Sequence, residues 1–305
     1  MKRYLAVALG LSVVCAGWVA AKPSKPAENA DDAVVQADHA VVTAFEKGDK
    51  AALKKLLDED FTWIDTDGIM WERPDVYRAG LKPLVPNASD VKITELKYGK
   101  VIWIQENQGN KFAAHFWVQR PEGWRLLHTN EIAVAPAERG ANVRPDFAVP
   151  CINPCKEVPY KPISESEKAA LAGWQDQEEK NHDAHMGENL IAVNSNSDGA
   201  ARAAAQASGK PTGDAPAPRA NRPPVGAAPA LWVRTWDFGD SVVAIMLQPT
   251  YGGKAYWSSR IFGNHNGFWK MEESYHNTIA TSPVMTVVPP KDVLAPAPPR
   301  GRGGE

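Results

Sequence analysis

Cysteine is scarce in this chain of 305 residues, which contains only Cys15, Cys151 and Cys155. Three thiols are too few to complete a sulfur-rich zinc site of four ligands. An excess of one charge sign is missing as well, because 34 lysines and arginines nearly balance 36 aspartates and glutamates to give a formal net charge of -2. The chain therefore lacks the basic footprint of a nucleic-acid-binding protein, and we expect no nucleic acid as a partner.

A long apolar run occurs only near the start of the chain. Two basic residues precede an apolar stretch from Leu5 to about Ala20. This pattern is typical of a secretory signal peptide (1–21), cut after Ala21. Because no later run reaches the roughly 20 residues that cross a bilayer, we expect no membrane span and a periplasmic or secreted mature protein.

The two remaining cysteines lie close together in the proline-rich stretch "PCINPC". In an exported protein, neighbouring cysteines are more often paired than free, so the sequence predicts a disulfide between Cys151 and Cys155. The alternative is one half of a metal site.

The order of features in the first half of the sequence returns in the second half, which indicates an internal duplication. Gly68 corresponds to Gly199 (199 - 68 = 131) and Trp124 corresponds to Trp269 (269 - 124 = 145), so the second copy carries an insertion. The corresponding segments are 44–68 with 174–199, 98–105 with 238–247, and 111–132 with 254–279.

The two copies differ in composition from the segments that connect or follow them. Stretches rich in alanine, proline and glycine have few groups that join a core, and they predict linkers or disorder. The predicted organisation is a signal peptide (1–21), a first domain (31–133), a proline-rich linker with the cysteine pair (134–164), a second domain (165–285) with a disordered insertion near 208–230, and a disordered tail (286–305).

Each copy changes its periodicity in the same direction. Residues 31–57 place apolar side chains at helical spacing with a break at Gly48, so two helices are predicted there. Runs typical of strands follow, and the turns "RPEG" and "NHNG" predict hairpins. Helices followed by successive strands predict two domains of the α+β class.

The stretches "AFEKGDKAALKKLLDEDFTWIDTDG" and "HFWVQRPEGWRLLHTNEI" resemble the nuclear transport factor 2-like superfamily, and more narrowly its exported SnoaL-like families of unknown function. This resemblance implies a cone in each copy, formed by a bent antiparallel sheet wrapped on N-terminal helices. It does not define an activity, because the superfamily includes isomerases, cyclases, dehydratases and binding modules. The favoured hypothesis is a tandem module that binds a small molecule in a cone-shaped pocket or serves as an interaction scaffold.

The alternative hypothesis is a cofactor-free isomerase, lyase or hydrolase in the first copy. Similarity to the ketosteroid isomerases of the superfamily places Asp65 at the general base and His115 near an acid of the oxyanion hole, whereas Val41 stands where those enzymes carry a tyrosine. A carboxylate and an imidazole in an apolar site can share a proton and activate a substrate. A purely structural buried pair of Asp65 and His115 explains the same pattern.

The predicted pocket draws on both copies. When the two copies are aligned, Asn196 corresponds to Asp65 and Arg260 corresponds to His115, so the second copy lacks the proposed base. The residues expected to line a pocket are Trp63, Trp103, Trp117, His128, Asn196 and Arg260.

Metal-binding patterns are incomplete in the sequence. The stretch "NSNSDG" resembles the start of a calcium loop, but Ala205 occupies the position of the bidentate glutamate. His182 and His185 have no partner ligand in the sequence pattern. We therefore expect neither a metal nor a cofactor.

The strands of the first copy are apolar on both faces. Phe112, Phe116 and Val118 alternate with His115 and Trp117. One face would line the cone, and the other requires a cover. A second copy on the same chain supplies it, so we predict an intramolecular pseudo-dimer of the two domains, paired sheet to sheet.

Overall fold

The computed structural model describes residues 32–134, 147–150, 159–179, 185–195, 230–249 and 253–288. The predicted signal peptide, the cysteine pair and the insertion near 208–230 lie outside the described residues. The helices are α1 (Asp32–Lys47), α2 (Lys50–Leu56), α3 (Arg73–Ala79) and α4 (Glu165–Glu179). The strands are β1 (Leu57–Ile64), β2 (Met70–Glu72), β3 (Lys92–Tyr98), β4 (Val101–Gln108), β5 (Lys111–Arg120), β6 (Gly123–Ala133), β7 (Phe147–Pro150), β8 (Met186–Asn194), β9 (Trp232–Asp237), β10 (Ser241–Gln248), β11 (Gly253–Lys254), β12 (Tyr256–His265), β13 (Phe268–Thr278) and β14 (Val284–Val288).

The break between α1 and α2 has a local cause. Gly48 has a φ of 68°, a backbone conformation that glycine adopts without a steric penalty. Asp49 then caps α2, since its Oδ1 accepts hydrogen bonds from the backbone N–H groups of Ala51 (3.1 Å) and Ala52 (3.0 Å). The two predicted helices are therefore separated at Gly48.

The first sheet has six strands in the order β2-β1-β6-β5-β4-β3. The pairs from β6 to β3 are antiparallel, but β1 runs parallel to β6. The sequence led us to expect a purely antiparallel sheet, and this expectation is wrong. Periodicity reveals strands but not their direction, and β1 enters the sheet after α2 rather than through a hairpin with its neighbour.

The second sheet has five strands in the order β8-β13-β12-β10-β9. It repeats the order β1-β6-β5-β4-β3, and β8 is likewise parallel to β13. The irregularities correspond too: the register shifts between Phe116 and Trp117 in β5, and between Ile261 and Phe262 in β12. Both sheets are thus mixed, and the molecule is α+β.

A small third sheet joins β11, β14 and β7 in that order. Strand β7 comes from the segment predicted as a linker, and β14 continues to Val288, within the segment predicted as a disordered tail. Val287 pairs with Val149 in the parallel ladder between β14 and β7.

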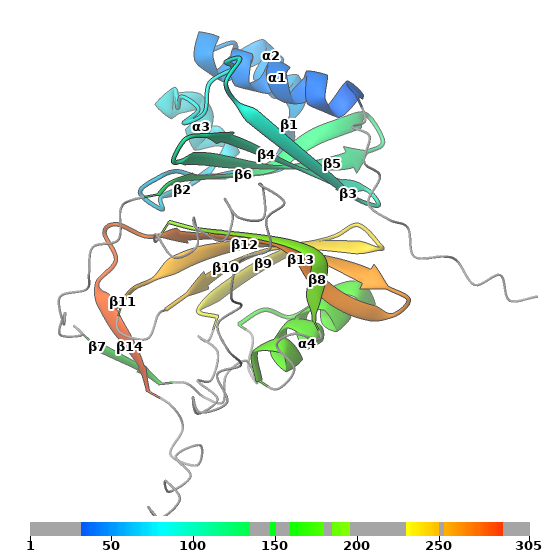
Figure 1. Ribbon diagram of the computed structural model, residues 1–305, viewed down its shortest axis with the longest axis vertical. Helices are drawn as coiled ribbons and strands as arrows, with labels where there is room; N and C mark the ends of the chain where they lie inside the picture. The colour runs from blue at the N-terminus through cyan, green and yellow to red at the C-terminus, as the bar shows by residue number, and fades with distance from the viewer. Residues whose placement is uncertain are drawn as a thin grey trace, which may run out of the picture.

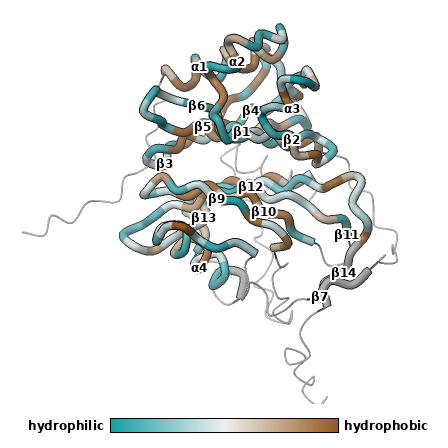
Figure 2. Tube along the Cα trace, turned by 180° about the vertical axis from the view of Figure 1, so that it is seen from behind, coloured by the Kyte–Doolittle hydropathy of each residue, from teal (hydrophilic) through white to brown (hydrophobic). Residues whose placement is uncertain are grey.

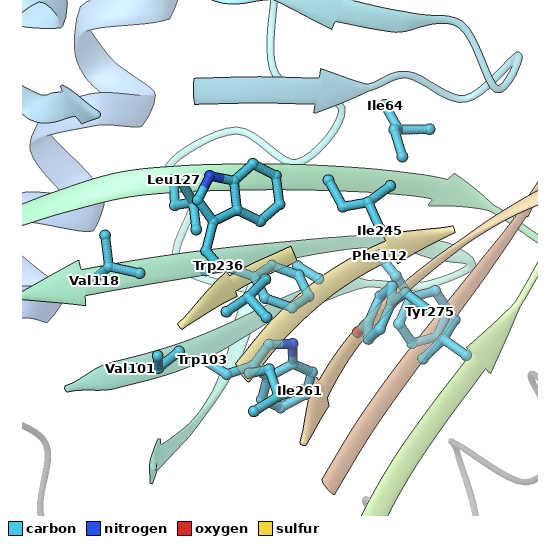
Figure 3. Close-up of a cluster of buried hydrophobic side chains, with 14 of the residues drawn as sticks. Ile64, Val101, Trp103, Phe112, Val118, Leu127, Trp236, Ile245, Ile261 and Tyr275 are labelled. Atoms are coloured by element: carbon cyan, nitrogen blue, oxygen red, sulfur yellow. The ribbon is translucent and has the colours of Figure 1, made fainter. Parts of the chain in front are cut away.

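The two large sheets lie face to face (Figure 1). Helices α1, α2 and α3 cover the outer face of the first sheet, and α4 covers the outer face of the second; the view from behind shows the same layers (Figure 2). Buried side chains from both sheets form one cluster between them, which we call the inter-sheet interface (Figure 3). It includes Ile64, Val101, Trp103, Phe112, Phe116, Val118 and Leu127 of the first sheet and Trp236, Val243, Ile245, Ile261 and Tyr275 of the second.

Polar contacts also cross the inter-sheet interface. Tyr98 donates a hydrogen bond to Glu273 (2.7 Å), and Arg234 pairs with Asp60 (3.0 Å). These bonds fix the lateral position of one sheet on the other, because apolar contact alone is not directional. No helix among the described residues is long and apolar enough to cross a membrane.

Candidate functional site

The first sheet separates its side chains onto two faces. Ile102, Ile104 and Glu106 of β4 alternate with Val101 and Trp103, so they face the helices rather than the second sheet. On β5, His115 lies directly opposite Ile104 and shares this face. The helix-covered face is therefore apolar around its centre and carries ionisable groups near Glu106.

His115 pairs with Asp38, a residue of α1. The Nδ1 atom of His115 lies 2.8 Å from the Oδ1 atom of Asp38, and the same oxygen accepts a hydrogen bond from Trp117 Nε1 at 2.6 Å. Asp38 is only 1% exposed and His115 4% exposed. Burial disfavours the charged imidazole, but the charge and hydrogen bond of Asp38 outweigh burial and raise the pKa of His115 to about 9.

Glu106 completes a group of three. One ligand-type atom from each of Asp38, Glu106 and His115 lies within 4.8 Å of the others. Burial, together with the nearby carboxylate of Asp38, raises the pKa of Glu106 to about 8 against the opposing effect of His115. We call these three residues the carboxylate–histidine cluster.

Two oxygens of this cluster lack a hydrogen-bond donor. Asp38 Oδ2 and Glu106 Oε2 are buried and have no partner among the described residues. Buried acceptors without a donor are costly, typically by about 1–3 kcal/mol each. Glu106 in its protonated form can donate to Asp38, whereas an ionised Glu106 leaves the cluster one donor or cation short of being satisfied.

Glu131 lies on the same face but is already hydrogen-bonded. Its Oε2 accepts from Trp63 Nε1 (3.1 Å) and its Oε1 accepts from the backbone N–H of Leu84 (2.6 Å). Burial nevertheless raises the pKa of Glu131 to about 7. The predicted pocket residues Trp63 and Trp117 thus hold Glu131 and Asp38 in place.

Asp65 does not join this cluster. It follows β1 and organises the turn toward β2: its Oδ1 accepts from the backbone N–H groups of Asp67 (3.0 Å) and Ile69 (2.9 Å), and its Oδ2 accepts from Trp71 Nε1 (2.8 Å). Among the described residues no hydrogen bond joins Asp65 to His115. The predicted pair of Asp65 and His115 must therefore be corrected, since turn formation occupies both oxygens of Asp65 and the partner of His115 is Asp38.

The turn after Asp65 also contacts the second sheet. Gly68 has a φ of 72°, and a Cβ atom added there would lie 2.7 Å from the Cα of Ile279. The backbone oxygen of Gly68 accepts a hydrogen bond from Trp257 Nε1 (2.9 Å), and Asn277 Nδ2 donates to the oxygen of Asp65 (2.7 Å). This turn therefore joins the first sheet to strands β12 and β13 of the second.

Trp103 and His128, which we expected to line a pocket, lie at the inter-sheet interface. Trp103 is in edge contact with Tyr275, with ring centroids 5.8 Å apart. The two ring nitrogens of His128 lie 2.8 Å from Thr62 Oγ1 and 2.8 Å from Ser259 Oγ, and burial lowers the pKa of His128 to about 3. Both residues therefore hold the sheets together, on the face opposite to His115.

Arg260 lies in the second sheet, at the strand position that corresponds to that of His115 in the first. It pairs with Ala244 across the β10–β12 ladder, as His115 pairs with Ile104. Its guanidinium lies 5.6 Å from the ring centroid of Trp174 in α4. Asn196 lies outside the described residues.

Sequence reasoning missed three acidic residues near His115. Glu106 ends the alternating run "VIWIQE", on the face of Ile102 and Ile104. Asp38 lies four residues after Val34 and three before Val41, on the apolar face of its helix. A charged residue on an apolar face is the pattern that would have revealed both residues, and the same alternation places Glu131 on the face of Thr129.

The chain matches no family model and no curated protein. Similar solved structures include a nuclear transport factor 2-like protein from Cytophaga hutchinsonii, at 18% identity and a TM-score of 0.29 over 35% of this chain and 99% of that chain. Another is a nuclear transport factor 2-like protein of unknown function in nutrient uptake from Rhodospirillum rubrum, at 17% identity and a TM-score of 0.23 over 33% and 98%. A third is the CaMKII hub of S. rosetta, at 17% identity and a TM-score of 0.25 over 36% and 98%. These identities and TM-scores carry no argument about activity.

Proposed function

We propose that this chain is an exported tandem of two nuclear transport factor 2-like domains that form an intramolecular pseudo-dimer. In this proposal the first domain binds a small ligand at the carboxylate–histidine cluster, and the second domain serves mainly as its structural partner. The ligand carries a positive charge or hydrogen-bond donors.

The repeated topology supports the tandem part of the proposal. Five strands recur in the same spatial order, each sheet contains one parallel pair, and the register shifts at corresponding positions of β5 and β12. Such agreement is expected of a duplicated domain, because strand irregularities are retained with the fold they shape.

The inter-sheet interface supports the pseudo-dimer. It combines aromatic and aliphatic side chains with bonds such as that between Tyr98 and Glu273. An exposed apolar sheet face would favour self-association, and a covalently linked second copy covers it at a high effective concentration.

One observation carries the ligand part of the proposal: Asp38 Oδ2 and Glu106 Oε2 are buried without a donor. Binding of a cationic or donor-bearing ligand would satisfy both oxygens and offset their cost of burial. The indole groups of Trp63 and Trp117 already donate to carboxylates at this face, so the cluster is held in position before a ligand arrives.

The alternative of an enzyme that uses Asp65 with His115 is disfavoured. A general base must reach its substrate with a free oxygen. The oxygens of Asp65 accept bonds from Asp67, Ile69 and Trp71 instead.

The proposal predicts that the mature chain retains a ligand through purification. Native mass spectrometry should show a bound species on the wild type that Glu106→Gln releases. Asp65→Asn is the matched control, because it alters a carboxylate outside the cluster and should leave the bound species in place. A wild type that carries no ligand, and whose melting temperature does not change with any member of a panel of small amines, amides and divalent cations, would refute the proposal.

A further inference from the structure

The carboxylate–histidine cluster has the composition of a metal site. We infer that Asp38, Glu106 and His115 bind one divalent metal ion of the Zn²⁺ type. This inference rests on the proposed function, because it assigns a chemical class to the ligand of the same site.

The donors come from separate elements that fix their positions. Asp38 belongs to α1, Glu106 to β4 and His115 to β5, and the two strands are adjacent. The donor atoms lie within 4.8 Å of one another, so small movements of the side chains would bring all three onto one ion. One imidazole nitrogen with two carboxylate oxygens suits Zn²⁺, whose sites commonly combine three protein ligands with a fourth open position.

The unpartnered oxygens are an independent indication of a cation. Asp38 and Glu106 are 1% and 2% exposed, and each has one buried oxygen without a donor. No lysine or arginine among the described residues forms an ion pair with either carboxylate, and His115 is the basic residue that pairs with Asp38. A divalent ion between the carboxylates would neutralise both of them and replace the charge that protonated His115 provides beside Asp38.

Residues around the cluster hold its carboxylates in position, as the hydrogen-bond partners of metal ligands commonly do. Trp117 Nε1 donates to Asp38 Oδ1 at 2.6 Å, which orients this carboxylate. Glu131 is beside the cluster, but bonds from Trp63 and Leu84 occupy its oxygens. It is therefore a neighbour rather than a ligand.

The second domain provides an internal contrast. By strand register, Arg260 occupies the place of His115 and Met246 that of Glu106; Arg260 Nη1 lies 3.7 Å from Met246 Sδ. A guanidinium and a thioether do not form a Zn²⁺ site. We therefore assign the ion to the first domain and not to the equivalent positions, Met246 and Arg260, of the second.

The test uses the full mature chain with Cys151→Ser and Cys155→Ser, so that no thiol competes for the ion. After treatment with a chelator, Zn²⁺ is titrated and the heat of binding and the tryptophan fluorescence are recorded. We expect one ion per chain and a raised melting temperature, since an ion that binds only the native state stabilises it. Mg²⁺, which prefers six oxygen ligands, should give neither response.

The variants identify the ligands. Glu106→Met introduces the residue of the second domain, preserves volume and removes an unpaired buried carboxylate, so the apo protein should fold and melt no lower than the wild type. It should abolish the saturable binding. Trp117→Phe retains the ring but loses the donor to Asp38, and should weaken binding by about 10–100-fold. His265→Gln is the control, since it removes a histidine–carboxylate pair outside the cluster and should leave binding unchanged.

Each outcome decides the inference. Binding that survives Glu106→Met, or an equal response to Mg²⁺ and Zn²⁺, would overturn it. A wild type that retains an organic ligand dependent on Glu106 but takes up no Zn²⁺ would overturn the metal site and leave the proposed function intact. A wild type that neither retains an organic ligand nor takes up Zn²⁺ would overturn both the metal site and the proposed function.

Discussion

The two large sheets differ most on the faces that their helices cover. At this face of the first sheet Asp38 of α1 meets Glu106 and His115, whereas at that of the second sheet Arg260 lies against Trp174. The faces that meet between the sheets are alike, since both are built from aromatic and branched aliphatic side chains. The faces that share one core are therefore similar in chemistry, whereas the helix-covered faces are not.

Separation of the two halves of the chain should have the largest effect. Residues 22–134 expressed alone would expose the apolar face that now forms the inter-sheet interface. We expect this fragment to dimerise or aggregate, because a large uncovered apolar face drives association. Light scattering tests this, and a well-behaved monomer of the fragment would contradict the pseudo-dimer.

Truncation of Trp103 should show how much the interface stabilises the whole chain. Trp103 is fully buried against Tyr275, so Trp103→Ala should lower the free energy of unfolding by ~3–5 kcal/mol. Phe268→Ala is the control, because Phe268 is 42% exposed and its loss should cost about 0.5 kcal/mol. Urea denaturation measures both, and similar losses would show that the interface is not a shared core.

The Asp65–Gly68 turn offers a sharper test of contact between domains. Gly68→Ala meets the backbone of Ile279, whereas Gly80→Ala has nothing within 4 Å, and both glycines have positive φ. The second variant should cost about 1 kcal/mol for backbone conformation, and the first about 2–3 kcal/mol because the turn must also shift. Equal decreases in melting temperature for the two variants would mean that the turn does not contact the second sheet.

Acid should weaken the interface through His128. Its pKa is lowered to about 3, from an ordinary value of 6.5, because it is buried. The unfolded chain binds a proton below about pH 6.5 and the folded chain does not until about pH 3, so His128 removes up to about 1.4 kcal/mol per pH unit across this window. His128→Gln should flatten the pH dependence of stability between pH 6.5 and 4, and an unchanged slope would contradict a neutral buried ring.

Part of this architecture could be predicted from the sequence. Helical spacing with a break at Gly48 located α1 and α2, and the "NHNG" turn coincides with positive φ at Asn266 and Gly267. The direction of β1 could not be predicted, because alternation is the same for parallel and antiparallel neighbours. Local patterns therefore fixed elements but not their pairing.

The site was located less completely. Alternation placed His115 on the correct face, but the partner of His115 depends on how α1 crosses the sheet, which no spacing in the sequence reveals. Asp65 was a reasonable candidate until its carboxylate proved to accept two backbone bonds within its own turn. The faces on which Trp103 and His128 lie could not be predicted either, because their strands are apolar on both faces and the sequence does not show which face meets the helices.

The small sheet of β11, β14 and β7 joins the chain segments that precede and follow the second large sheet. Strand β7 precedes this domain and β14 follows it, yet Phe147 pairs with Met285 and Pro150 with Val288. Neither end can therefore unravel independently, and tension applied to both ends would shear this ladder before it reached the large sheet. A protease cut between residues 151 and 158 would leave two fragments still held by the same strands, so the nicked protein should migrate as one species until it is denatured and reduced.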